Sequence, residues 1–146
     1  MSDFPDAVHA KIEALCEKGD VLVENSKFDK ALEQYEKALQ LVPDPKTDYE
    51  AATWIYAALG DTYFFMQKYD AAKNSFYDAL NCFQGQGNPF IHLRLGQRLF
   101  ELNDPVNAAD QLMRAFMAEG PEIFMEDDPK YLTFLKSQID AETENK

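Results

Sequence analysis

The sequence predicts an all-α fold made of three antiparallel helix hairpins, followed by one further helix. Two observations carry this prediction. A pattern of small and bulky residues recurs at the same offsets from Gly19, Gly60 and Gly96. Within each repeat, a short polar break separates two stretches whose apolar residues recur at i, i+4 and i+7, the spacing of one helix face.

The repeated pattern is a small residue, a bulky one three places later, and then a small–bulky–small trio. Its positions are Gly19, Leu22, Ala31, Tyr35 and Ala38; Gly60, Tyr63, Ala72, Phe76 and Ala79; and Gly96, Leu99, Ala108, Leu112 and Ala115. Small residues let two helix backbones approach closely, and the large residues fill the space beside them. This spacing predicts tightly packed helix pairs.

Over about residues 12–122 this pattern resembles the tetratricopeptide repeat (TPR) family. The resemblance implies a right-handed superhelix with repeats at about 12–45, 53–86 and 89–122. We expect a single domain over residues 1–146.

Capping and breaking residues predict where the elements begin and end. The polar breaks lie at Asn25-Ser26, Gln67-Lys68 and Asn103-Asp104. An N-cap residue followed by proline occurs at Asn88-Pro89, Asp104-Pro105 and Asp128-Pro129. Thr47 with Glu50 reads as a capping box, and Tyr49, Ala52 and Tyr56 continue the apolar face backwards, which favours a helix start near Asp48 over a longer loop.

The C-terminal segment has no repeat signature. Residues 129–139 are amphipathic, which predicts a capping helix over the apolar face of the last repeat. Residues 140–146 are polar and are expected to be a frayed tail.

The charge balance bears on the partner. The chain has 14 basic and 26 acidic residues, a net charge of −12, which disfavours nucleic acid and anionic membranes. It favours another protein that is basic or amphipathic, although the charge could equally serve solubility alone.

No apolar run reaches the roughly 20 residues of a membrane span, and no secretory signal is visible, so we expect a cytoplasmic protein. Monomer and homodimer both remain open.

Catalytic and metal motifs are absent from the sequence, so we expect a non-enzymatic protein without cofactor or metal. His9 and His92 have no ligand partner at helical spacing, and His92 falls on the packing face of the third hairpin. Cys16 and Cys82 form no CxxC pair and are interpreted as reduced, structural thiols, with Cys16 toward the groove.

The TPR resemblance implies a concave groove lined by the first helix of each hairpin. The positions that match its inward face give an aromatic and acidic set for binding a partner: Trp54, Asp61, Phe64, Phe65, Phe90, Gln97, Phe100 and Asp20. Aromatic anchors beside charges are typical of protein-binding hot spots. The alternative is that Trp54, Phe64 and Phe90 pack inside the repeat array.

Some TPR domains grip a C-terminal carboxylate with a clamp of Lys, Asn, Asn, Lys and Arg. The matching positions here are Cys16, Asp20, Ala58, Phe90 and Arg94, of which only Arg94 agrees. We therefore hypothesise an adaptor or chaperone that binds a peptide or helix of a partner. The alternative is an acidic stoichiometric inhibitor or immunity-type protein that masks a basic toxin.

Overall fold

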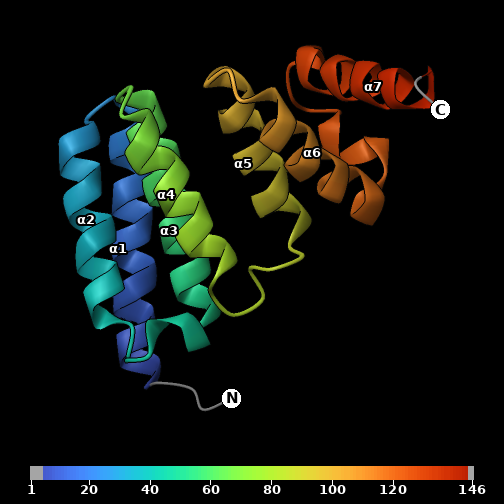
Figure 1. Ribbon diagram of the computed structural model, residues 1–146. Helices are drawn as coiled ribbons and strands as arrows, with labels where there is room; N and C mark the ends of the chain where they lie inside the picture. The colour runs from blue at the N-terminus through green and yellow to red at the C-terminus, as the bar shows by residue number, and fades with distance from the viewer. Residues whose placement is uncertain (1–4, 145–146) are drawn as a thin grey trace. The chain divides into compact units, whose positions relative to one another are not determined.

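The computed structural model describes residues 5–144, which form seven α-helices, two short 3-10 helices and no strand. The helices are α1 (Asp6–Glu24), α2 (Phe28–Leu41), α3 (Glu50–Phe65), α4 (Tyr69–Leu80), α5 (Pro89–Glu101), α6 (Pro105–Glu119) and α7 (Pro129–Glu144), and Figure 1 shows them in order. The predicted all-α fold is confirmed. The structure divides into two compact units, one that ends at Gln86 and one that begins at Gly87.

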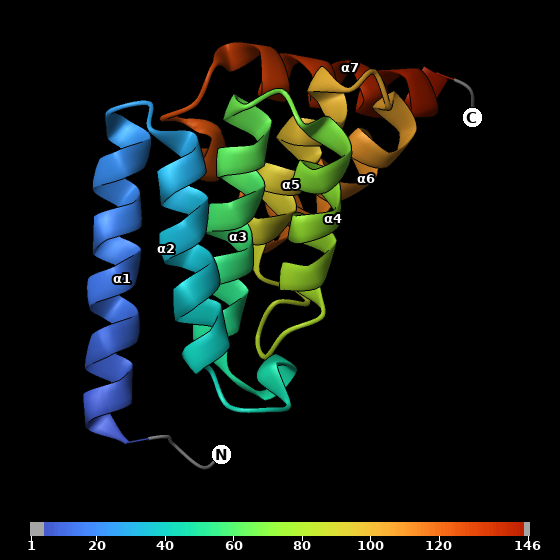
Figure 2. The ribbon, with the colours of Figure 1, turned by 90° about the vertical axis from the view of Figure 1, so that its left-hand side faces the viewer.

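Unit 1 consists of the antiparallel hairpins α1–α2 and α3–α4, in which α1, α2 and α3 lie side by side (Figure 2). A Cβ atom at Gly19 would lie 2.7 Å from the ring of Tyr35, and one at Gly60 would lie 2.6 Å from the ring of Phe76. Both rings are almost completely buried. The spacing of small and bulky residues therefore marks real contacts between paired helices, as predicted.

The start of α3 differs from the prediction. The helix begins at Glu50 rather than near Asp48, and its N-cap, Tyr49, is extended with no side-chain capping bond. Lys46–Asp48 form a separate 3-10 turn. The predicted capping box of Thr47 and Glu50 is wrong, because the residue at the N-cap is Tyr49. The Thr47 carbonyl accepts a hydrogen bond from the Phe83 amide at 2.7 Å, which ties this stretch to the segment that follows α4.

Unit 2 consists of the α5–α6 hairpin and α7. A Cβ at Gly96 would lie 2.7 Å from Leu112, which repeats the contact of the first two hairpins. From α7, Tyr131 and Leu135 are buried together with Leu112 and Phe124, so this helix covers the third hairpin as expected.

The ends of these helices mostly agree with the sequence. Asn88 caps α5 by accepting hydrogen bonds from two backbone amides, Asp104 caps α6, and the Asp128 carboxylate accepts from the Lys130 amide at 3.0 Å. In contrast, α7 continues to Glu144, five residues beyond the predicted end at 139. The expected frayed tail is therefore helical over 140–144, and residues 145–146 lie outside the described part.

Candidate functional site

The candidate site in unit 1 is a groove between α1 and α3, which we call the α1/α3 groove. Residues three or four apart on a helix share one face, and both helices present such a series here. The groove has a volume of about 250 Å³ and is lined by His9, Ile12, Glu13, Cys16 and Asp20 of α1 and by Ala51, Trp54, Ile55 and Ala58 of α3. Its floor is apolar and its α1 side carries two carboxylates.

Burial and the nearby carboxylates together determine the chemistry of the Cys16 thiol in the α1/α3 groove. Burial, followed by the charges of Asp20 and Glu13, raises the pKa of Cys16 to about 11. A raised pKa keeps the group as a neutral thiol at pH 7, which is the opposite of an activated nucleophile. Cys16 is thus part of the groove lining, and both cysteines are free in the structure.

Asp20 is tied to the core of unit 1. The Tyr35 hydroxyl, on a ring that is 2% exposed, donates a hydrogen bond to Asp20 Oδ1 at 2.5 Å. Burial and this bond raise the pKa of Tyr35 above its usual range, so the phenol stays protonated and remains a donor. The bond holds the Asp20 carboxylate at the wall of the groove.

Trp54 is the aromatic residue of this groove. Its side chain is 38% exposed, although it lies between Thr53 and Ile55, which are both buried. The indole Nε1 donates to Glu50 Oε1 at 3.3 Å, one turn earlier on α3. A large aromatic that is held in place yet open to solvent is the usual form of an interface anchor.

Unit 2 has a separate and larger hollow, the α5 cleft, with a volume of about 720 Å³. One wall is the face of α5, and the other is the segment from the end of α6 to the start of α7. The lining residues are Phe90, Leu93, Arg94, Gln97 and Arg98 on one side and Glu119, Glu122, Ile123, Met125, Glu126 and Asp127 on the other. Gln97 Nε2 donates to Asp127 Oδ2 at 3.0 Å and so ties the two walls together.

The structure brings some of the predicted partner-binding residues together and separates others. Asp20 and Trp54 line the α1/α3 groove, whereas Phe90, which is 52% exposed, and Gln97, which is buried, line the α5 cleft. Asp61 lies two turns after Trp54, outside the lining of the groove, and its charge contributes to the raised pKa of Tyr35.

The remaining predicted residues belong to two aromatic clusters. The Phe64 ring lies 5.3 Å from Tyr69, and the Phe65 ring lies 5.9 Å from Phe28, so these residues pack around the hairpin turns of unit 1. The Phe100 ring meets Tyr131 at 5.5 Å and Phe134 at 4.9 Å. Phe100 therefore packs beneath α7, because the C-terminal helix occupies the face that the repeat pattern alone leaves open.

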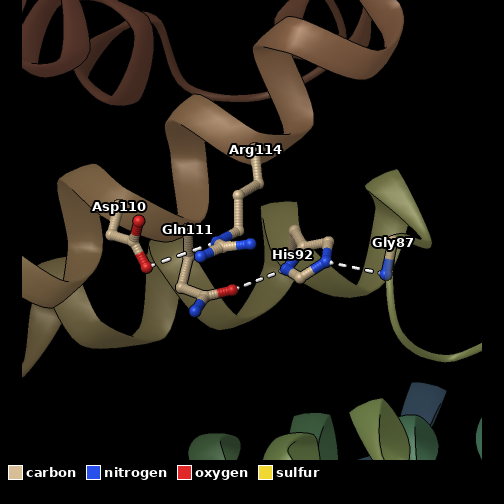
Figure 3. A network of polar contacts seen from close by, with 5 residues as sticks. All are labelled: Gly87, His92, Asp110, Gln111 and Arg114. Carbon is tan, nitrogen blue, oxygen red and sulfur yellow. Dashed lines mark hydrogen bonds and ion pairs between the residues drawn. The ribbon is translucent and has the colours of Figure 1, made fainter.

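The buried histidine of unit 2 is part of the packing, as the sequence predicts. Figure 3 shows the His92 ring between Gln111 and Gly87. Its Nδ1 lies 2.6 Å from Gln111 Oε1, and its Nε2 lies 3.1 Å from the Gly87 amide. Because the Gly87 amide must donate, Nε2 accepts. Nδ1 therefore carries the ring proton and donates a hydrogen bond to Gln111 Oε1. Beside this network, Arg114 pairs with Asp110 at 3.3 Å on the exposed side of α6.

Sequence reasoning did not identify one wall of the α5 cleft. Met125, Glu126 and Asp127 form part of this wall, and Asp127 accepts a hydrogen bond from Gln97. The available signal was the Gly120-Pro121 break, after which Ile123 and Phe124 add apolar residues outside any repeat. Apolar side chains in this segment must pack against another part of the protein, but the sequence does not indicate which part.

Residues 5–144 offer neither a membrane-spanning helix nor a cluster of metal ligands. None of the helices there combines the length and the apolar character required to cross a membrane. In the same range, no group of three or more His, Cys, Asp or Glu side chains is placed to hold a metal ion.

Comparison with known proteins gives one family match. A family model described as tetratricopeptide repeat matches residues 11–85, which contain α2, α3 and α4 and most of α1. A comparison with curated proteins finds none that matches the chain significantly.

Solved structures with the same fold include three with about one residue in five identical. The first TPR domain of Spaghetti, bound to the HSP90 peptide SRMEEVD, has a TM-score of 0.68 and 19% identity, and the match covers 92% of this chain and 94% of that one. The Yersinia enterocolitica secretion chaperone SycD, in complex with a peptide of the translocator YopD, has a TM-score of 0.66 and 20% identity over 86% and 89%. Pseudomonas aeruginosa PilF has a TM-score of 0.68 and 20% identity over 90% and 55%.

Proposed function

The chain belongs to the tetratricopeptide repeat family, and on this premise we propose that it is a non-enzymatic protein-interaction module of the adaptor or chaperone kind. It binds a peptide or helix of a partner protein, and Trp54 in the α1/α3 groove is the anchor of that contact. The observation that carries the proposal is the exposed, hydrogen-bonded indole in an apolar groove with carboxylates on one side. Two proteins of the same fold, Spaghetti and SycD, each bind a peptide, which supports this class of function.

The charge of the groove argues for a basic or amphipathic segment. The peptide on Spaghetti, SRMEEVD, carries three acidic residues. In this chain, Asp20 occupies a position where the carboxylate clamp has an asparagine, and Glu13 lies in the same lining. An acidic peptide end would meet like charges at this site, which costs binding free energy. We therefore propose a partner of opposite charge.

The α5 cleft contributes a second contact surface in this proposal. Phe90 and Met125 are large apolar side chains with 52% and 67% of their surface exposed, and both line the cleft. Exposed apolar residues that gather in a hollow are common at protein interfaces. The lining of the cleft carries four carboxylates and also two arginines, so unlike the α1/α3 groove it offers charged groups of both signs.

The competing function is an acidic inhibitor that masks a basic toxin, and the net charge of −12 favours it. The two functions differ in their dependence on salt. A masking inhibitor binds through long-range charge and weakens steeply as ionic strength rises, whereas a groove anchored by an aromatic residue weakens much less.

Trp54 and Tyr77 allow a matched test, because their exposed fractions are 38% and 37% and Tyr77 lies outside both hollows. Wild type, Trp54→Ala and Tyr77→Ala are immobilised and used to capture proteins from the native host. A captured protein is then purified and its affinity measured by calorimetry. We expect Trp54→Ala to lose about 2 kcal/mol of binding or more, and Tyr77→Ala to bind as wild type.

Melting temperatures of the three proteins complete the test. Trp54→Ala should fold, because its side chain is already partly exposed. Normal capture by Trp54→Ala would refute the groove and leave the acidic mask as the better explanation. A severe loss of stability in Trp54→Ala would show instead that the residue belongs to the core.

A further inference from the structure

We propose that the α1/α3 groove selects a lysine or arginine side chain of the bound segment, which lies over the apolar floor with its cation between Asp20, Glu13 and Trp54. This inference rests on the proposed function, because it states which residue of a partner enters that groove. It is carried by the size of the groove, by the sign of its charges and by the way Asp20 is held.

The size of the groove suits one long, thin side chain. Its volume of about 250 Å³ is below the roughly 300–1,000 Å³ of typical small-molecule sites. The space exists because Ala51, Ala58 and Cys16 are small residues at positions where two helices face each other, above the buried side chains of Ile12 and Ile55. An aliphatic stem can lie on such a floor while its charged end stays at the polar edge.

The lining of the groove contains more acidic than basic side chains. Glu13 and Asp20 are the carboxylates, and no lysine or arginine is among the lining residues. His9 lies 3.3 Å from Glu13 in an i, i+4 pair whose side chains are 55% and 65% exposed, so water screens it strongly. Burial is the main reason for the raised pKa of Cys16, and the charges of Asp20 and Glu13 add to it. An incoming cation is therefore attracted, and an anion is repelled.

Asp20 is ready to receive a cation without rearrangement. Tyr35 donates to its Oδ1, and a carboxylate has a second oxygen that can accept from an ammonium or guanidinium group. Trp54 completes the edge, with its Nε1 directed to Glu50. An indole ring favours a nearby cation through its electron-rich face.

Other occupants fit less well. A purely apolar side chain would remove water from the two carboxylates without offering them a further hydrogen-bond donor, and this loss of hydration is unfavourable. An acidic side chain adds repulsion to that cost. Lysine and arginine are the side chains that combine an aliphatic stem for the apolar floor with a cation for the carboxylates at the edge.

The test uses Cys16 as a built-in probe and needs no partner. In a Cys82→Ser background, Cys16 is the only thiol of the chain. Its rate of modification is measured with a cationic reagent, 2-aminoethyl methanethiosulfonate, and with an anionic one, 2-sulfonatoethyl methanethiosulfonate. The ratio of the two rates is divided by the same ratio for N-acetylcysteine amide. Any change in the thiolate fraction of Cys16 affects both reagents equally and cancels in this ratio.

We expect the normalised ratio to exceed one by about tenfold or more, because electrostatic steering changes encounter rates by factors of 10 to 10³. Asp20→Asn and Glu13→Gln should each lower it several-fold. Glu17→Gln removes the same charge from an exposed position of α1 outside the lining and should leave it near the wild-type value. Ionic strength of about 1 M, where the Debye length is about 3 Å, should lower it as well.

A second measurement tests the side chain itself. The indole N–H resonance of Trp54 is followed by NMR during titration with n-butylammonium, n-butylguanidinium, n-butanol and butyrate. Saturable shifts with the two cations alone support the inference. Equal shifts with butanol, or a normalised reagent ratio near one, overturn it.

The inference and the proposed function fail in different ways. If partner binding requires Trp54 but the reagent ratio is near one, the groove binds a partner without selecting a cation. If the ratio is high but Trp54→Ala binds the partner normally, the groove prefers cations and the partner site lies elsewhere.

Discussion

The hydroxyl of Tyr35 donates to Asp20 Oδ1 at 2.5 Å, and this contact links the packing of the first hairpin to the wall of the α1/α3 groove. Tyr35 also fills the space beside Gly19, where a Cβ would lie 2.7 Å from its ring. One side chain therefore serves both the close approach of α1 and α2 and the orientation of a carboxylate that lines the groove.

The first prediction removes only that hydroxyl. Tyr35→Phe keeps the ring beside Gly19, so we expect a loss of about 1–2 kcal/mol in the free energy of unfolding, the range for a hydrogen bond to a charged group that is partly solvated. Tyr77→Phe, which removes a phenol at a 37% exposed position, is the control. Chemical denaturation followed by circular dichroism measures both, and equal stability of the two variants would contradict the role of the bond.

The second prediction concerns the close approach at Gly60. A Cβ there would lie 2.6 Å from the fully buried Phe76 ring, which has little room to move. Gly60→Val should lose about 1–3 kcal/mol of stability through overpacking. Valine has a better intrinsic helix propensity than glycine, so propensity does not explain a loss. Ala14→Val, at an exposed position of α1, measures the helical cost of valine alone, and a wild-type melting temperature for Gly60→Val would refute the packing.

The third prediction concerns His92, which is 3% exposed and bonded on both ring nitrogens. His92→Phe leaves the Gly87 amide and the Gln111 side chain without these partners, and should cost about 1–3 kcal/mol of stability. Adding Gln111→Leu removes one unpaired group, so the double variant should lose less than the sum of the single variants. His9→Phe is the exposed control, and strict additivity would show that the two residues do not interact.

The fourth prediction is a pH dependence at the junction of α5 and α7. Glu101 accepts from Lys130 Nζ at 2.7 Å and from the Tyr131 hydroxyl at 2.9 Å. The hydrogen bond from Lys130, opposed by burial and helped by Tyr131, lowers the pKa of Glu101 in the folded protein. A lowered folded pKa gives stability that is present above the unfolded value and is lost as pH falls through the folded value.

Glu101→Gln should therefore melt below wild type at pH 6–8, and the difference should shrink below about pH 4, near the ordinary glutamate pKa. At the alkaline end the same junction behaves in the opposite sense. Burial and the bond to Glu101 raise the pKa of Tyr131 to about 12, so the contribution of its neutral form is present below about pH 10 and is lost as pH rises through 12. Glu33→Gln, an exposed glutamate of α2, is the control, and a gap between wild type and Glu101→Gln that does not change with pH would contradict the assignment.

The repeat contacts could be predicted from sequence because they depend on local spacing. Gly19 with Tyr35 and Gly60 with Phe76 are separated by the length of one hairpin, and the helical period places each on the inner face. The same reasoning placed His92 in the packing of the third hairpin, where it is buried and bonded to Gln111. Two residues of the predicted binding set, Asp20 and Trp54, line the α1/α3 groove.

Other features depended on residues far apart in the chain. The stretch before α3 is joined to a segment more than 30 residues later by the bond between the Thr47 carbonyl and the Phe83 amide, which no local pattern reveals. Phe100 has the same offset from its glycine as a groove residue, yet it lies under α7 because Tyr131 and Phe134 come to meet it. The distance in sequence from the repeat glycine cannot distinguish a residue that is open to a partner protein from one that another helix of the chain already covers.

By itself, the sequence determined the all-α fold, the three hairpins and the residues that share each helix face, since a period of 3.6 residues is a local property of the backbone. The tertiary structure alone decided which faces were covered and which stayed open. It placed Asp20 beside the Tyr35 hydroxyl and left Trp54 exposed in the α1/α3 groove. It also packed the Phe100 ring against Phe134 of α7. Coverage depends on contacts between distant segments, and these arise only when the apolar faces of separate helices are buried against one another.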